Sequence, residues 1–181
     1  MNVVNIGMKI NIKSKNLFIR NLRISDISNK YISALNNYEI VKYTEARHKT
    51  WNYNLVKKNI IYSRKNKVPF LGIFLNDHTH IGNIRLPGHD KKNKRILLGI
   101  MVFDTSFNGK GYGTEALKHL SDYLLSECDI NKITADYCIK NVASKRMFKK
   151  SNYKVEGILR KNLLIENSYE DTEIVSLNKK I

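Results

Sequence analysis

Residues 107–116, FNGKGYGTEA, decide how the rest of the chain is interpreted. Gly109, Gly111 and Gly113 stand at alternate positions, directly before an apolar pattern of helical spacing. The first backbone N–H groups of a helix have no internal partner, and the helix dipole adds positive potential there. Glycine lets the backbone turn sharply and approach a ligand closely. The stretch therefore predicts a phosphate cradle, with a pyrophosphate as the favoured ligand.

The spacing of these glycines excludes two common phosphate-binding motifs. The pattern GxxxxGK[ST] is absent, and the dinucleotide fingerprint needs G-x-G-x-x-G where this chain has G-x-G-x-G. The stretch also follows four predicted strands, whereas the fingerprint belongs to the first strand–helix turn. A turn that merely links a strand to a helix is the structural alternative.

Apolar periodicity predicts the elements before the glycines. We expect a strand at 17–24, a helix capped by Ser25 that runs to about 37, a polar loop at 41–50, a helix at about 51–65, a hairpin turning at 76–79, and one central strand at 94–104. After the glycines we expect a helix to about 127, a strand at 132–140, a short helix capped by Asn141, and strands at 152–159 and 170–178.

This order of elements predicts the fold class. It reads β-α-α-β-β-β-α-β-α-β-β, which fits an α+β domain with a mostly antiparallel sheet and one central β-α-β crossover. We expect a single domain over residues 1–181, with residues 1–16 as an irregular N-terminal extension.

Composition narrows the class of protein. The net charge of +16, from 32 Lys and Arg against 16 Asp and Glu, favours anionic partners, although the joint excess of Lys, Asn and Ile equally fits an AT-rich genome. Cys128 and Cys138 form neither a disulfide framework nor a zinc site. No apolar run is long enough for a membrane span and no secretory signal is present. We therefore expect a cytoplasmic protein.

Two separated stretches carry a family resemblance. Residues 108–113, NGKGYG, resemble the Q/R-x-x-G-x-G/A signature of the GNAT superfamily of acyl-CoA N-acyltransferases. Residues 138–157, CIKNVASKRMFKKSNYKVEG, resemble its second signature, a strand ending in N-x-x-S and a short helix running to K-x-G-F. Asn108 replaces the usual Gln or Arg, and Asn152-Tyr153 replaces Gly-Phe. The resemblance is closest to the Rim-type (ribosomal-protein alanine acetyltransferase-like) branch, and it implies a GNAT-like mixed sheet with helices on both faces.

The resemblance implies acetyl-CoA as the co-substrate. Loop amides would bind its pyrophosphate, and the backbone of the preceding, splayed strand would pair with the pantetheine arm and polarise the thioester carbonyl. Asn141 would contact the pantetheine amides, and Lys150 would meet the 3′-phosphate unless it is simply solvated. The implied coenzyme-binding residues are Ile100, Met101, Val102, Asn108, Gly109, Lys110, Gly111, Tyr112, Gly113, Thr114, Asn141 and Lys150.

The resemblance also implies direct acetyl transfer to an amine. No acyl-enzyme is expected, because neither cysteine falls at a recognisable nucleophile site, and no metal is expected, because His78 and His80 lie in a tight turn with no third ligand. Many members place a tyrosine in the short helix to protonate the leaving thiolate, but Phe148 occupies that position here. Ser144, one turn earlier, is the alternative acid. Candidate bases are Glu45 and Asp171, with His48 as a third option.

The acceptor is less constrained by the sequence. The positive charge disfavours cationic polyamines and aminoglycosides, and it suits a nucleotide-linked amino sugar, with a ribosomal-protein N-terminus as the next choice. Arg47 and His48 are the expected substrate contacts. No membrane partner is expected, and a homodimer is left open. The rivals are a non-catalytic basic domain that binds RNA, and a GNAT fold that senses acyl-CoA without catalysis.

Overall fold

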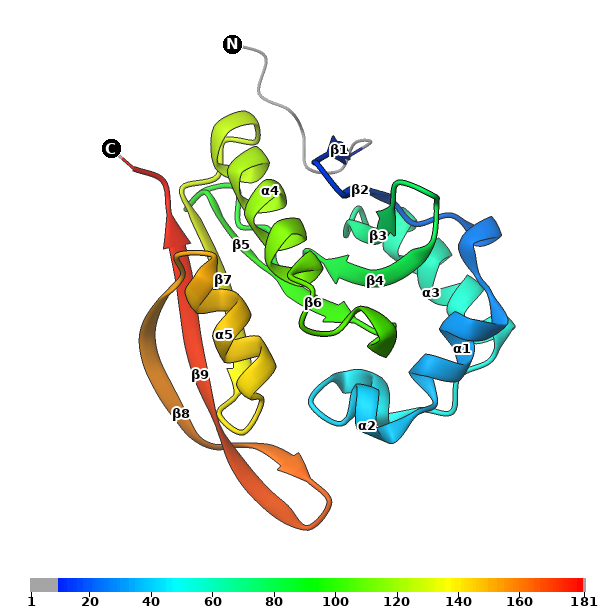
Figure 1. Cartoon of the computed structure of the whole chain (residues 1–181). Helices are drawn as coiled ribbons and strands as arrows, with labels where there is room; N and C mark the ends of the chain where they lie inside the picture. Colours follow the sequence, from blue (N-terminus) through cyan, green and yellow to red (C-terminus); the bar gives the residue numbers. More distant parts are fainter. Residues whose placement is uncertain (1–9, 181) are drawn as a thin grey trace.

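The structure, a computed structural model, describes residues 10–180 and contains two β-sheets (Figure 1). The five-stranded sheet has the order β1 (Asn11–Lys13), β2 (Leu17–Asn21), β3 (Phe70–Leu75), β4 (His80–Arg85), β6 (Gly99–Val102). The four-stranded sheet has the order β5 (Arg95–Leu97), β7 (Lys132–Cys138), β9 (Ser168–Asn178), β8 (Lys154–Ile165).

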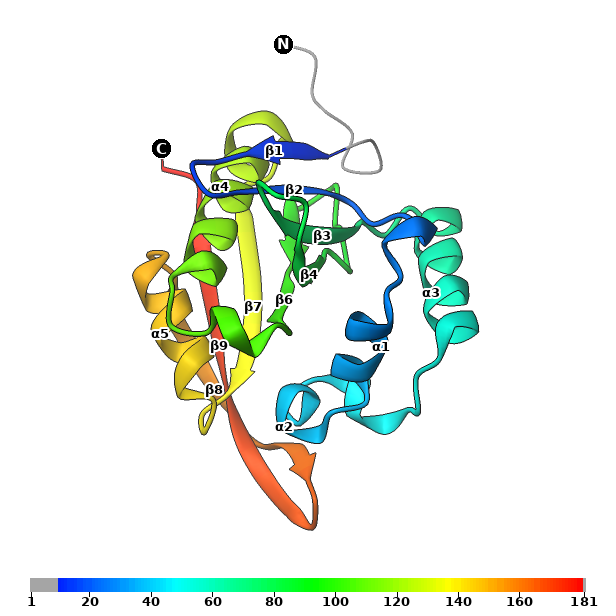
Figure 2. The ribbon, with the colours of Figure 1, turned by 45° about the vertical axis from the view of Figure 1, so that its right-hand side comes forward.

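Helices cover both sides of this arrangement (Figure 2). The α-helices are α1 (Asn29–Leu35), α2 (Tyr38–Val41), α3 (Tyr53–Lys65), α4 (Tyr112–Glu127) and α5 (Val142–Lys150). The short 3₁₀ helices are η1 (Ile24–Asp26), η2 (Glu45–His48) and η3 (Thr105–Phe107). No helix among residues 10–180 is long and apolar enough to cross a membrane.

The strand directions confirm the predicted fold class. All the paired strands are antiparallel except β5 and β7, which run parallel. A parallel pair needs a crossover connection. Here the chain leaves β5, passes through β6 of the other sheet and then α4, and returns as β7. The mixed α+β architecture with a central β-α-β unit is therefore present.

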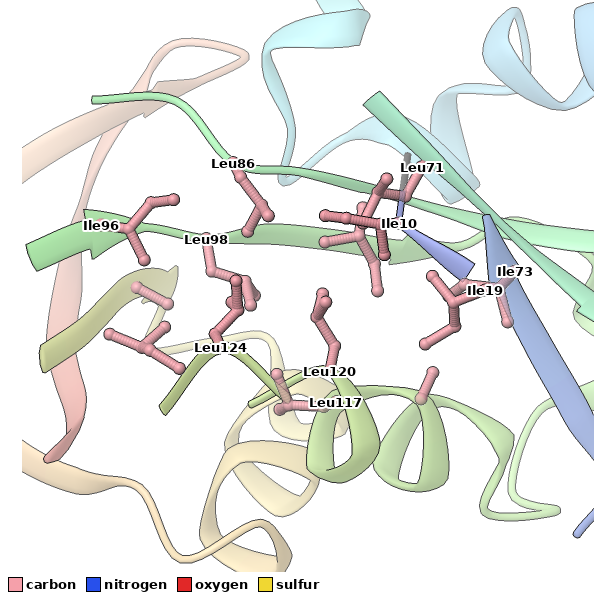
Figure 3. Close-up of a cluster of buried hydrophobic side chains, with 14 of the residues drawn as sticks. Ile10, Ile19, Leu71, Ile73, Leu86, Ile96, Leu98, Leu117, Leu120 and Leu124 are labelled. Carbon is pink, nitrogen blue, oxygen red and sulfur yellow. The ribbon is translucent and has the colours of Figure 1, made fainter. Parts of the chain in front are cut away.

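Two apolar clusters hold the helices against the five-stranded sheet. On one face, Leu117, Leu120 and Leu124 of α4 pack toward the strand residues Ile19 and Ile73 (Figure 3). The other face packs against α1 and α3 in a second cluster. The members of that cluster are Leu22, Tyr31, Ala34, Leu35, Val56, Ile60, Phe70, Phe74 and Phe103. Burial on both faces explains why β3 is apolar throughout.

The predicted single strand at 94–104 is wrong, because the segment divides between the two sheets. β5 pairs with β7, whereas β6 pairs with β4. The N–H of Leu98, between the two strands, donates to the carbonyl of Thr134 at 2.8 Å. The run is apolar on both sides of the division, so periodicity gave no signal of the break.

The predictions before the hairpin also need correction. Ser28, not Ser25, caps α1, since its Oγ accepts from the N–H of Tyr31 at 3.1 Å. Ser25 lies inside η1, which Asp26 stabilises through Arg20 and the N–H of Arg23. Asp26 therefore closes a separate turn before the helix begins.

Other boundaries differ by less. The expected polar loop at 41–50 contains the end of α2 and the 3₁₀ helix η2. The helix expected from residue 51 begins at Tyr53 after the cap Asn52, and ends as predicted at Lys65. The extension expected at 1–16 contains strand β1, and residues 1–9 lie outside the described part. The hairpin turn at 76–79 and the Asn141 cap are confirmed.

Candidate active site

The glycine loop turns directly into the N-terminus of α4. Gly109 and Gly111 have φ values of +75° and +87°, in the left-handed region that favours glycine. Gly111 is the N-cap of α4 and offers no side-chain cap. The first turn of this helix is thus left without a capping side chain, which fits a terminus that receives an external anion.

Several loop amides point to no protein acceptor. Among the described residues, no hydrogen bond uses the N–H groups of Gly109, Gly111, Tyr112, Gly113 or Thr114. The N–H groups of Asn108 and Lys110 donate instead to Thr105 and Phe107 within the turn. Two of the predicted coenzyme-binding residues therefore use their amides to shape the loop, and five amides are left for an anion.

The strands β6 and β7 leave facing backbone edges open. The Leu98–Thr134 hydrogen bond is the last that joins this segment to β7. Beyond it, β6 is the edge of its sheet, and no described strand pairs with its Ile100–Val102 side. The predicted coenzyme strand therefore has an edge free for β-strand addition by a ligand.

A cavity of about 540 Å³ opens beside these strands. Its lining includes Ile100 and Met101 of β6, together with Asn141 and Ser144 of the second motif. Other parts of the lining come from α1, η2 and α3 and from β4, the strand paired with β6. The cavity thus extends from the predicted coenzyme strand to α1, α3 and η2.

Ser144 and Asn141 meet through the cap of α5. The Asn141 Oδ1 accepts from the backbone N–H of Ser144 at 3.1 Å, and both residues line the cavity. The Ser144 hydroxyl has no hydrogen-bond partner among the described residues. Phe148 stacks on Tyr137 with ring centroids 5.5 Å apart, so its side chain packs in the core. Ser144 is therefore the hydroxyl of α5 that faces the cavity.

The candidate bases separate in space. Glu45 lines the cavity from η2, where its side chain is 85% exposed. Asp171 is not part of the lining; its carboxylate accepts from the Lys161 N–H at 2.8 Å and from Arg160 at 2.7 Å. These contacts hold the pKa of Asp171 below its ordinary value. Asp171 therefore stabilises an irregularity of the β8–β9 ribbon, away from the cavity.

Asp136 is a cavity carboxylate that the sequence analysis missed. It lies on β7, in the part of the strand beyond its pairing with β5. Asp136 is exposed on one side, but partial desolvation by its surroundings raises its pKa, and the negative charge of Glu45 raises it further. The alternation of Ile133, Ala135 and Tyr137 already set Asp136 on the opposite face of the strand, and this signal was available.

The remaining predicted contacts lie away from the cavity. The Arg47 guanidinium donates to the carbonyls of Thr44 at 2.7 Å and Leu164 at 3.1 Å, and its side chain is only 7% exposed. His48 is exposed and is not part of the lining. Lys150 is exposed in the last turn of α5. Residues 10–180 contain no group of three or more metal-ligating side chains.

Comparisons with known proteins agree with this geometry. Residues 16–154 match the family described as the acetyltransferase (GNAT) domain. A probable N-acetyltransferase, YjcK of Bacillus subtilis, is 35% identical over 74 residues, which span 41% of this chain and 41% of that relative.

Solved structures share the fold at low identity. RimL, a ribosomal L7/L12 α-N-protein acetyltransferase in complex with coenzyme A, superposes with a TM-score of 0.83 at 16% identity, covering 93% of this chain and 98% of that one. Spermidine N-acetyltransferase from Vibrio cholerae, in complex with CoA and spermine, has a TM-score of 0.80 at 16% identity, covering 90% and 95%.

Proposed function

The chain belongs to the GNAT acetyltransferase family, and from this premise we propose that it transfers an acetyl group directly from acetyl-CoA to a primary amine. The observation that carries the proposal is the combination of free helix-terminal amides after Gly111 with an open edge on β6, the strand that precedes this loop and lines the cavity through Ile100 and Met101. Each feature fits one part of an acyl-CoA: the amides fit a pyrophosphate, and the edge fits the amide groups of a pantetheine arm.

The residues around the cavity support a division of proton transfers. When bound, acetyl-CoA supplies an acetyl group activated as a thioester. Asp136, whose pKa is raised by partial desolvation and by Glu45, takes the proton of the acceptor amine, directly or through water. Ser144 donates a hydrogen bond to the departing sulfur, while Asn141 keeps α5 in place. Glu45 holds the amine near the mouth of the cavity.

The sequence favours two acceptor classes, and one structural neighbour is named for the second of them, a ribosomal protein. RimL is named for a ribosomal protein and its solved neighbour for spermidine, so this fold admits both peptide and small amines. We favour a nucleotide-linked amino sugar over a protein N-terminus. A cationic polyamine fits less well, because Arg85 and Lys49 contribute positive charge to the same cavity as Glu45 and Asp136.

The test is calorimetric titration of acetyl-CoA, followed by thiol release over nucleotide-linked amino sugars, N-terminal peptides and polyamines. We expect micromolar binding that Gly111→Val abolishes, because a β-branched residue cannot hold a φ of +87° without distorting the turn. Lys118→Ala is the control, since this exposed residue lies on α4 just beyond the loop and leaves both glycines intact. Equal affinity in the wild type and Gly111→Val would remove the loop from the coenzyme site.

A further inference from the structure

Arg85 is a half-buried cation in the cavity wall without an acidic partner. Its Nη1 donates to Asn59 Oδ1 at 3.2 Å, and its Nη2 donates to Ser63 Oγ at 2.7 Å. The guanidinium carbon lies 4.7 Å from the ring centroid of Phe70. No carboxylate of residues 10–180 lies within 4.0 Å of it. A buried charge is costly unless it is paired, so the absence of a counter-ion indicates that a ligand provides one.

Asn83, two residues earlier on the same face of β4, presents a second unsatisfied group. Its side chain is buried, with the residue only 6% exposed. The Oδ1 atom lies 3.0 Å from His80 Nε2, but Nδ2 has no hydrogen-bond partner in the described chain. Buried donors are almost always paired, so this amide needs an acceptor. Asn83 and Arg85 both line the cavity, where such an acceptor would bind.

Open space lies between these donors and Asp136. The Cα of Arg85 pairs with Gly99 of β6, and no atom lies within 4 Å of a Cβ built on Gly99. Asp136 comes two residues after Thr134, just as Gly99 comes two residues after its partner Leu97. Arg85 belongs to the strand on one side of Gly99 and Asp136 to the strand on the other, and both residues line the cavity. The floor of the cavity therefore has a cationic side and an acidic side.

We propose that the acceptor is a small amine with an anionic group close to it, a carboxylate or a phosphoryl group, and that Arg85 and Asn83 Nδ2 bind this anion. The amine then lies over Gly99 toward Asp136, and the anion completes the hydrogen bonding that β4 leaves unpaired. The inference rests on the proposed acetyl transfer and adds the acceptor class to it. It also excludes polyamines, because a second cation would meet Arg85.

The experiment compares matched acceptors that differ only in the anion. One arm pairs α-amino acids with their amides, and the other pairs hexosamine phosphates with the free hexosamines. We expect one arm to show kcat/KM at least about tenfold higher for the anionic member, the size expected from one hydrogen bond to a charged group. The arm that responds identifies the anion as carboxylate or phosphate. Equal rates for both members in both arms would overturn the proposal.

Three variants assign the preference to the residues. Arg85→Met keeps the packing on Phe70 but removes the charge, so the ratio of kcat/KM between the anionic and the neutral member should fall to about one. Arg85→Lys should retain part of the preference. Gly99→Val fills the open floor without backbone strain, and it should block both members. If Arg85→Met slows neutral and anionic members equally, Arg85 is structural and the proposal fails.

A binding measurement separates this inference from the proposed function. The anionic compounds are titrated into the wild type and Arg85→Met, each with and without saturating CoA. Loss of acetyl-CoA binding would defeat the proposed function, but anion binding that depends on Arg85 would still support the cavity assignment. Conversely, tight acetyl-CoA binding with no anion binding to the wild type would leave acetyl transfer intact and overturn the acceptor class.

Discussion

Asn141 caps α5 by accepting from the backbone N–H of Ser144, so the Ser144 hydroxyl can be removed without removing the cap. The Ser144 N–H donates to Asn141 Oδ1, and alanine keeps that bond. We expect Ser144→Ala to lower kcat by about ten- to a thousand-fold, within the range for acid–base groups, with acetyl-CoA affinity nearly unchanged. Steady-state kinetics and calorimetry check this. A fully active variant would reduce Ser144 to an ordinary first-turn residue.

Neutralising Asp136 and neutralising Asp171 should shift Tm at neutral pH in opposite directions. The pKa of Asp136 is raised in the folded state by partial desolvation and by Glu45, so its ionised form destabilises the fold at any pH above its folded pKa. Below its ordinary value near 3.8, both states are protonated and this effect is absent. Asp136→Asn should therefore raise Tm at neutral pH and show no difference in strong acid. If Asp136 is the base, Asp136→Asn should also lower kcat/KM by roughly 10²- to 10⁴-fold.

The matched control for that prediction is Asp171→Asn. The Lys161 amide and Arg160 lower the pKa of Asp171, so its ionised form stabilises the fold above the ordinary aspartate pKa, and this stability is lost as the pH falls through the folded pKa. Asp171→Asn should lower Tm at neutral pH and leave the pH profile of kcat/KM unchanged. Loss of the acidic limb of that profile in Asp171→Asn, but not in Asp136→Asn, would exchange their roles.

At the scale of elements, the β8–β9 hairpin extends past the sheets toward the segment around α2 (Figure 1), and Arg47 joins the two by donating to the Leu164 carbonyl. This contact fixes the η2 wall that carries Glu45. Arg47→Gln should loosen this wall and raise the KM for the acceptor roughly tenfold, which corresponds to about 1.4 kcal/mol of binding free energy. The Kd for acetyl-CoA should not change. His48→Asn, on the same turn and exposed, is the control. An effect of His48→Asn as large as that of Arg47→Gln would restore the predicted substrate role of His48.

Elements that depend on near neighbours were predictable from the sequence. The turn at Gly111 and the cap at Asn141 rest on residues within a few positions, so local chemistry fixes them. The role of Arg47 depends on a carbonyl 117 residues further along, and local composition contains no sign of its burial. Arg85 and Asp136 come from different sheets, and their meeting at one cavity depends on the division at Leu98 that periodicity missed.

At the scale of the whole molecule, the charge of +16 does not by itself favour RNA. Residues 42–54, KYTEARHKTWNYN, interleave aromatic with basic residues, the pattern behind the RNA-binding alternative. Trp51 is used internally, since its Nε1 donates to the Ala46 carbonyl at 2.9 Å and the residue lines the cavity. Tyr53 begins α3 and is 45% exposed. The aromatic surface for a nucleic acid is therefore smaller than the sequence indicated, and Trp51 belongs to the cavity wall.

The two sheets give the whole molecule a measurable response to its coenzyme. Beyond Leu98 and Thr134, β6 and β7 have no backbone bond to each other, so a ligand between them adds contacts to both sheets. At 100 times its Kd, acetyl-CoA should stabilise the fold by about 2.7 kcal/mol. For a domain of this size that corresponds to a rise in Tm of roughly 5–10 °C, measured by thermal unfolding. Gly111→Val should lose the shift, whereas single-stranded RNA should produce none. A shift with RNA that falls steeply with salt, and none with acetyl-CoA, would instead favour the nucleic-acid-binding alternative.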